Sequence, residues 1–336
     1  MNLKQCIRKT LRVVLPLALG CVLLWYLYKD QNLGEMVAVI KKGVRYDIIL
    51  FSLVFGLLAN VVRGYRWGLL TDSLGGQRVK RFNLIFSVLG MYAINMALPR
   101  VGEIWRCGVI SKYDKVPFTK LIGTLLVDRV MDTLVVGLMT LCIFVFNIRF
   151  FTHYFSKNPE LLANITSMFT SVWMYVAIVI IILIIWLLFT KWGHLSIIQK
   201  GKGVLLNIWE GIKSLWKMEH KFRFFLQTLM IWGGYFLYFY ITFYAFGFTH
   251  NLGLRIGLIV FTMSSLSMAL PVQGGIGVWH FMVISTMVSF GVLETDASAY
   301  ALVVYTMQTT WTVFVGLVGI AALPVKNREK AINIKK

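Results

Sequence analysis

Charged side chains are scarce in this chain. Only 14% of its 336 residues are charged, whereas about a quarter of the residues of a typical soluble domain carry a charge. Apolar residues make up 58% of the chain, and its mean hydropathy is +0.73. These values exclude a soluble globular domain and predict an all-α polytopic membrane protein.

Motifs for catalysis and for metal binding are also missing from the sequence. The five histidines show no HExxH spacing, and the chain has neither a Walker A sequence nor a GxSxG element. The four cysteines are dispersed, without a CxxC pair: Cys6, Cys21, Cys107 and Cys142. We therefore expect no metal, no cofactor, no direct use of ATP and no enzymatic activity.

The excess of basic residues has a different meaning here from the one it has in a soluble protein. The formal net charge is +20, which in a soluble protein would suggest a nucleic-acid partner. In this chain the lysines and arginines lie mostly between apolar runs, where they set topology and contact anionic headgroups. We expect the membrane, and not nucleic acid, to be the partner.

Apolar runs predict six full spans, at residues 13–28, 47–70, 121–146, 168–190, 225–246 and 297–323. The first is interpreted as an uncleaved span and not as a signal peptide, because its apolar run continues past Cys21. Residues 33–44 form a short amphipathic piece, and 205–215 predict a helix on the membrane surface. We interpret residues 1–336 as a single integral membrane domain, with halves of about 1–165 and 166–336.

Two further apolar segments, 82–103 and 254–290, are interrupted by the same four residues. Met-Ala-Leu-Pro occurs at 96–99 and again at 268–271, 172 positions later, and glycine follows each copy within three or four residues. Proline removes a backbone donor and glycine lowers helix propensity, so we expect both segments to break there. Paired interruptions in two halves are typical of transporter binding sites, although four residues can also recur by chance. We expect the two breaks to meet near the membrane centre.

The distribution of basic residues predicts the topology. If each interrupted segment enters and leaves on one side, 24 of the 34 lysines and arginines face the cytoplasm, as the positive-inside rule requires. Both termini are then cytoplasmic, and the two hairpins dip from opposite sides as an inverted repeat. Charge alone leaves open whether each hairpin is re-entrant or crosses the membrane twice.

Ionisable residues inside predicted spans are the main candidates for a functional site, because charge in hydrocarbon is costly. The candidates for substrate binding are Arg63, Arg66, Arg100, Glu103, Arg106, Asp128, Arg129, Asp132, Gln273, Gly274, Gly275 and His280. Structural alternatives are ion pairs of Arg129 with Asp132 and of Glu103 with Arg106, an Arg66 that reaches the headgroups, and a His280 that only packs. Tyr235 belongs to an aromatic run that we expect to face lipid or to pack.

Four ordered motifs give the chain a family resemblance. They are Arg63-Gly-Tyr-Arg66-Trp67, Leu98-Pro-Arg-Val-Gly-Glu103 with Arg106, Asp128-Arg-Val-Met-Asp132, and Pro271-Val-Gln-Gly-Gly-Ile-Gly-Val278. Together they resemble the lysylphosphatidylglycerol synthase transmembrane, flippase-like family over nearly the whole chain. The last motif departs from the family, because Trp279-His280 stands where a glutamate is usual, and we expect no soluble aminoacyl-transferring domain. The resemblance implies a multi-pass protein of the bacterial inner membrane that handles lipid, and it argues against aminoacylation.

These observations predict a lipid flippase or transporter for a phospholipid or lipid-linked headgroup, anionic or zwitterionic. Guanidinium groups are suited to phosphate, and we expect Arg63, Arg100 and Arg129 to form successive phosphate stations, with helix N-termini after Gly102 and Gly275 as further donors. We expect five charged residues to converge on one polar cavity that opens to the cytoplasmic side: Glu103, Arg106, Asp128, Arg129 and Asp132. The alternatives are a membrane-embedded transferase acting on a lipid-linked substrate and a non-transporting envelope assembly factor.

Overall fold

Helices make up every regular element of the part of the chain that the structure describes. The structure is a computed structural model, and it describes residues 33–41, 43–75, 78–148, 218–267 and 272–333, with a few single residues elsewhere. The predicted spans at 13–28 and 168–190, the surface helix at 205–215 and the second Met-Ala-Leu-Pro copy at 268–271 fall outside these ranges.

Four of the described helices are long and apolar enough to cross a membrane. They are α3 (Tyr46–Asp72), α6 (Phe118–Phe146), α11 (Lys221–Tyr240), which continues as the 3-10 turn η1 (Ile241–Ala245), and α14 (Glu294–Asn333). Each coincides with a predicted span. At about 1.5 Å per residue, the 27 residues of α3 extend for about 40 Å, which exceeds the roughly 30 Å hydrocarbon thickness.

The first interrupted segment folds as two antiparallel helices, α4 (Arg81–Ala97) and α5 (Val101–Asp114), which we call the first hairpin. The break predicted at Pro99 is present. Leu98 is extended, and Arg100 adopts a left-handed conformation with φ 63°. Helices of 17 and 14 residues are about 26 and 21 Å long, shorter than the bilayer core.

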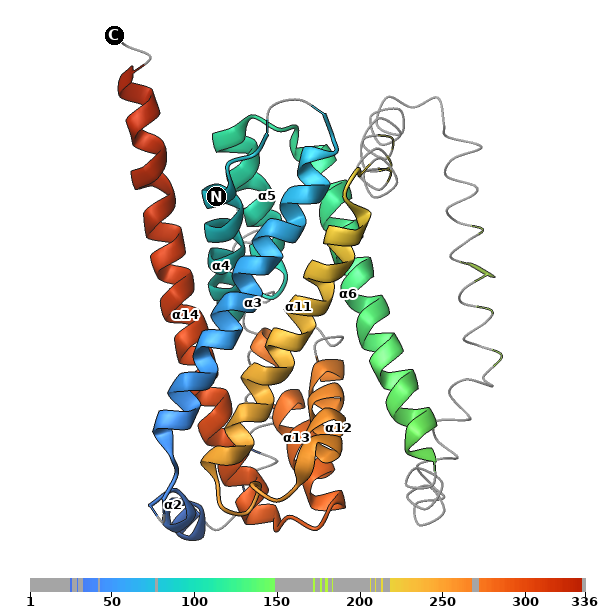
Figure 1. The fold of residues 1–336 in the computed structure, drawn as a ribbon, viewed down its shortest axis with the longest axis vertical. Coiled ribbons are helices and arrows are strands. Elements are labelled where there is room, and N and C mark those ends of the chain that lie inside the picture. Colours follow the sequence, from blue (N-terminus) through green and yellow to red (C-terminus); the bar gives the residue numbers. More distant parts are fainter. Residues whose placement is uncertain are drawn as a thin grey trace, which may run out of the picture.

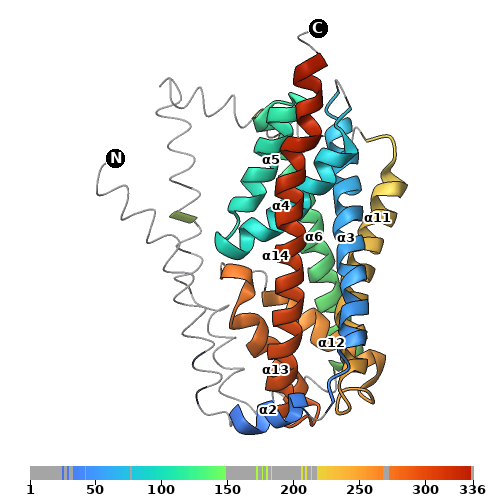
Figure 2. The same ribbon diagram turned by 90° about the vertical axis from the view of Figure 1, so that its left-hand side faces the viewer.

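The second interrupted segment gives α12 (Gly253–Leu266), the short 3-10 turn η3 (Gln273–Gly275) and α13 (Val278–Ser289), which we call the second hairpin. The break is marked by left-handed glycines, with φ 58° at Gly274 and 76° at Gly275. Figures 1 and 2 show that the two hairpins occupy opposite ends of the bundle: α4 and α5 lie in its upper half, and α12 and α13 in its lower half. A short helix, α2 (Leu33–Lys41), lies across the lower end.

The two hairpins meet at their tips. A Cβ added to Gly274 in η3 would lie 2.7 Å from the Sδ atom of Met96, in the last turn of α4. The hydroxyl of Tyr305 on α14 donates a hydrogen bond to the carbonyl of Gly274 at 3.0 Å and holds this tip in place. The break at Pro99 and the glycine break at 274–275 therefore lie next to each other, where the two hairpins meet.

Helices from the two predicted halves of the chain pack directly on each other. α14 packs along α4, and α11 along α3. Gly316 of α14 lies so close to α4 that an added Cβ would be 2.4 Å from the Cβ of Ala93. Small residues allow helix backbones in membranes to approach in this way, since lipid supplies little hydrophobic driving force for association. The result is a tight helical bundle around α3 and α4.

Candidate functional site

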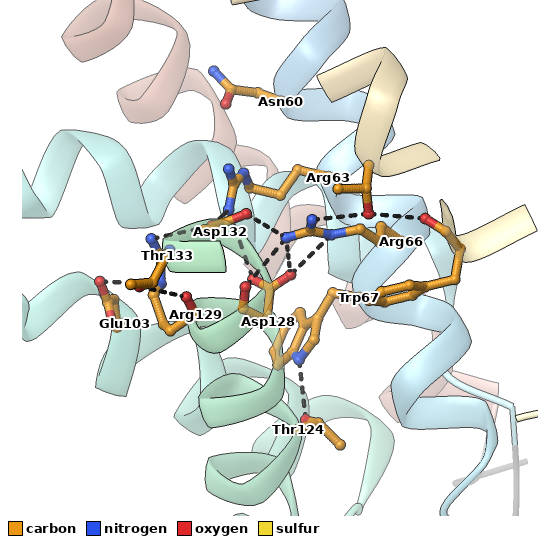
Figure 3. Close-up of polar contacts among 12 residues, drawn as sticks. Asn60, Arg63, Arg66, Trp67, Glu103, Thr124, Asp128, Arg129, Asp132 and Thr133 are labelled. Carbon is orange, nitrogen blue, oxygen red and sulfur yellow. Dashed lines mark hydrogen bonds and ion pairs between the residues drawn. The ribbon is translucent and has the colours of Figure 1, made fainter. Parts of the chain in front are cut away.

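Ionic contacts join α3 to α6 beside the first hairpin. α3 carries Arg63 and Arg66, and α6 carries Asp128 and Asp132, one helical turn apart. The Arg66 Nη2 atom donates to both carboxylates, with 2.8 Å to the Oδ1 atom of Asp132, and its Nε atom lies 3.1 Å from the Oδ1 atom of Asp128 (Figure 3). Arg66 and Asp128 are fully buried. At about 1.5 Å per residue, both lie roughly 10–15 Å from the nearer helix ends.

Arg63 extends the contacts toward α11. Its Nη1 atom donates to the Oδ2 atom of Asp132, and its Nε atom lies 3.3 Å from the hydroxyl of Tyr235. That hydroxyl donates to the Oδ1 atom of Asn60 at 2.6 Å and lies 2.9 Å from the hydroxyl of Tyr92 on α4. Arg63 is therefore bonded to side chains of two other helices, Asp132 on α6 and Tyr235 on α11.

The first hairpin contributes a third buried arginine. Arg106 of α5 donates from Nη2 to the Oδ2 atom of Asp128 at 2.8 Å, and its guanidinium lies 4.4 Å from the ring centroid of Trp67. The indole nitrogen of Trp67 is itself bound to the hydroxyl of Thr124 on α6, 3.1 Å away. A cation stacked on an indole face and bonded to a carboxylate is held by two independent interactions.

Glu103 and Arg129 form the edge of the same group. The Arg129 Nε atom lies 3.4 Å from the Oε1 atom of Glu103, and the Nη1 atom lies 3.6 Å from the Oδ2 atom of Asp132. The side chain of Arg129 is 32% exposed and that of Glu103 is 19% exposed, whereas the Arg66 side chain is fully covered. This edge is the most open part of the site.

We call these seven residues the charge cluster: Arg63, Arg66, Glu103, Arg106, Asp128, Arg129 and Asp132. It holds four cations and three carboxylates, so its formal charge is +1. Charges in a membrane interior are normally paired, because an isolated ion loses most of its hydration energy there. The surplus positive charge makes the charge cluster a suitable place for an anion.

The pairing differs from the alternatives that the sequence suggested. Glu103 contacts Arg129 and not Arg106, and Asp132 is bound by Arg63 and Arg66 at shorter distances than by Arg129. The i, i+3 spacing on α6 brings Arg129 only within 3.6 Å, whereas α3 approaches α6 from the opposite side. Arg66 is buried and does not reach the headgroups.

The helix N-terminus of α5 offers fewer free donors than expected. The backbone N–H of Gly102 donates to the Oδ1 atom of Asn95 at 2.8 Å, and that of Val101 to the carbonyl of Leu98 at 3.2 Å. Two of the four N–H groups at the start of the helix are therefore already used. Arg100, at the tip, is exposed.

The remaining candidates lie around the second hairpin, in a group without formal charge. Gly274 is held by Tyr305, and the His280 ring lies 4.5 Å from the ring of Tyr305 and 5.5 Å from that of Trp279. A Cβ added to Gly275 would lie 3.5 Å from the Oγ atom of Ser267. Of Gln273 only the backbone is described, in η3.

Tyr235, Asn60 and Trp67 belong to the site and were not among the candidates. Tyr235 was expected to face lipid or to pack, but its hydroxyl lies in the polar interior beside Arg63. A tyrosine hydroxyl in the middle of an apolar span needs a buried partner, and that need was the available signal. Among the described residues, no group of three or more His, Cys, Asp or Glu side chains has a metal-binding arrangement.

Fold and site together define a helical, multi-pass membrane protein with a buried charge cluster. The family described as "Lysylphosphatidylglycerol synthase TM region" matches residues 13–316, and the chain belongs to this family. No curated protein and no solved structure matches the chain. The resemblance inferred from four motifs is confirmed, and it places the protein among membrane domains linked to lipid and envelope processes.

Proposed function

We propose that the protein moves a phospholipid, or another lipid with a phosphate in its headgroup, between the leaflets of the bacterial inner membrane without changing it chemically. The observation that carries this proposal is the charge cluster, which holds four arginines and three carboxylates between membrane helices of a lipid-related family. Arginine is the side chain best suited to phosphate oxygens, because its planar fork can donate two parallel hydrogen bonds.

The architecture of this transporter is proposed to be an inverted repeat. α3, the first hairpin and α6 would correspond to α11, the second hairpin and α14, with six full spans and both termini in the cytoplasm. Two features support this: the hairpins occupy opposite ends of the bundle (Figure 1), and their tips touch at Met96 and Gly274. Broken helices that meet at the midplane form the substrate site in many transporters.

Within the charge cluster, Arg129 is proposed as the phosphate-binding residue, with Arg100 at the hairpin tip as a second cation. Arg129 is partly exposed, and its nearest carboxylate atom is 3.4 Å away. Arg100 is exposed, lies three residues before Glu103, and makes no side-chain hydrogen bond or ion pair with the residues that the structure describes. Arg63, Arg66 and Arg106 instead hold α3, α5 and α6 together through Asp128 and Asp132.

The direct test is lipid movement in reconstituted vesicles. Purified protein is placed in phosphatidylcholine vesicles that carry a trace of fluorescent phosphatidylglycerol or phosphatidylethanolamine, and a membrane-impermeant reductant bleaches the outer leaflet. Transport predicts that more than half of the probe is bleached with the wild type, and that Arg129→Gln behaves like protein-free vesicles.

Mass spectrometry of the same vesicles separates transport from chemistry. A transporter returns every lipid with its mass unchanged, whereas a transferase changes the mass of its substrate. A wild type that moves neither probe would overturn the proposal and favour an assembly role. A change in lipid mass would favour a transferase.

A further inference from the structure

The ion pair between Glu103 and Arg129 differs from the other ion pairs in the charge cluster. Its closest approach is 3.4 Å, whereas Arg66 reaches Asp132 at 2.8 Å and Arg106 reaches Asp128 at the same distance. Charge-assisted N–H···O hydrogen bonds are normally about 2.7–2.9 Å long. It is also the most exposed pair of the charge cluster, so the weakest contact coincides with the most open position.

The guanidinium of Arg129 lacks a close oxygen partner in the described part of the chain. Its Nε atom is buried but donates no hydrogen bond, its Nη1 atom is 3.6 Å from Asp132, and its Nη2 atom faces the thioether of Met91 at 3.8 Å. Sulfur is a weak acceptor. A guanidinium whose three donor nitrogens have no oxygen at hydrogen-bonding distance can donate two parallel hydrogen bonds to the oxygens of a phosphate.

We propose that Glu103 is a resident counter-ion: its carboxylate occupies the phosphate position beside Arg129 when no lipid is bound, and the phosphate of an incoming lipid displaces it. This inference rests on the proposed function, and it assigns to Glu103 a role that the arginines alone do not supply. It makes binding an exchange of one anion for another, so the membrane interior never holds Arg129 without a partner.

The position of Glu103 suits such an exchange. It lies in the first turn of α5, where the helix dipole favours a negative charge. The carboxylate is therefore still stabilised by the dipole after a lipid phosphate has replaced it at Arg129. Arg100, three residues earlier, adds a second cation to the same tip of the first hairpin. The carboxylate of Glu103 therefore competes with the lipid phosphate for Arg129 and weakens lipid binding, but the phosphate can still displace it. When the carboxylate returns to Arg129, it helps to release the lipid.

The test is the affinity of Glu103→Gln for a soluble lipid. Dihexanoyl phosphatidylglycerol below its micelle concentration is titrated into the full chain in neutral detergent, and binding is measured by calorimetry. Removing the competing carboxylate is expected to lower the Kd about tenfold relative to wild type, because the phosphate no longer has to displace an ion pair. Flipping in vesicles is expected to slow, since release loses its competitor.

Glu103→Asp serves as the matched variant, because it keeps the charge and withdraws it by one methylene. It is expected to bind the lipid with an affinity between those of wild type and Glu103→Gln, and it keeps the test valid if the glutamine variant does not fold. The proposal is overturned if Glu103→Gln binds the lipid with a Kd equal to or higher than that of wild type. If Glu103→Gln does not fold, the proposal is overturned when Glu103→Asp binds the lipid with the same affinity as wild type.

Inorganic phosphate, titrated in parallel, identifies the source of the anion. If Glu103→Gln has a lower Kd than wild type for the lipid and not for inorganic phosphate, the ligand is a lipid headgroup. If its Kd is lower for inorganic phosphate alone, that assignment is overturned. The outcome is separable from the proposed function. If Glu103→Gln binds the lipid more tightly while the wild type moves no lipid in vesicles, the counter-ion role stands and transport fails.

Discussion

The two hairpins have similar shapes and opposite chemistry. The first packs against the charge cluster, and its own helix α5 contributes Glu103 and Arg106 to it. The second has serine and threonine hydroxyls that mostly bond to carbonyls of their own helix, such as Ser264 and Ser265 to Phe261, and an aromatic group around His280. A helical hairpin with a broken tip therefore lies in a charged environment in one half of the bundle and in a neutral one in the other.

In the proposed transporter, this difference would give the two hairpins different tasks. A neutral, close-packed tip held by Tyr305 can close one end of a pathway, but it offers an anion no charged partner. The charge cluster can bind an anion, and its internal carboxylates keep the arginines paired while the site is empty. If the bundle is an inverted repeat, its symmetry lies in the backbone and not in the chemistry of the side chains.

The largest expected effect comes from removing the central carboxylate of the charge cluster. Asp128→Asn leaves Arg66 and Arg106 without their shared buried partner, so we expect the free energy of unfolding in detergent to fall by about 3–5 kcal/mol. Ser265→Ala in the second hairpin removes only a hydroxyl bonded to its own helix at 2.8 Å and should cost less than about 1 kcal/mol. Denaturant titration of both variants measures the difference, and equal losses would contradict the comparison.

A smaller effect is expected from the packing of the first hairpin. A Cβ at Gly102 would lie 2.2 Å from the carbonyl oxygen of Met91 and would compete with Asn95 for the same space. We expect Gly102→Ala to lower the free energy of unfolding by about 1–3 kcal/mol through overpacking.

Gly108 of the same helix is the matched control for Gly102. A Cβ there meets nothing within 4 Å among the described residues, so Gly108→Ala should stabilise α5 by about 0.5–1 kcal/mol through helix propensity. Thermal melts of the two variants in the same detergent check both signs. A loss of stability in both would show that α5 tolerates no added methyl group, and the close approach at Gly102 would not be the cause.

Local signals in the sequence predicted the backbone well. Pro99 lacks an amide donor, so the interruption between α4 and α5 follows from the residue itself. The four spans within the described ranges follow from uninterrupted apolar runs of sufficient length. These features depend on neighbours in the chain and need no knowledge of the fold.

Partner choice inside the charge cluster depended on distant contacts and was only partly predicted. The sequence indicated which charges would lie in the membrane, but it favoured i, i+3 pairs within one helix, and these are not the close pairs that form. The close partners of Asp132 come from α3, more than 60 residues away in the chain. Tyr235 was missed for the same reason, because its partners Asn60 and Tyr92 belong to other helices.

The smallest effect is expected at Arg100, where stability and function should separate. Arg100 holds φ 63°, a conformation that costs a side-chain-bearing residue about 1–2 kcal/mol and that glycine adopts freely. A strained arginine at the tip of the first hairpin suggests that its charge is needed there. Arg100→Gly is therefore expected to leave the free energy of unfolding unchanged or raise it by up to about 1 kcal/mol, while lipid movement in vesicles falls.

Lys115 provides the control for this prediction, because it stands at the other end of α5 with φ 59° and is also exposed. Lys115→Gly should relieve the same strain with the same small gain in stability, but it removes a charge outside the proposed path and should leave lipid movement intact. Vesicle assays and thermal melts of the two variants give the answer together. If both variants transport like wild type, the charge at Arg100 has no part in moving the lipid, and the conformation of this residue merely allows the chain to turn between α4 and α5.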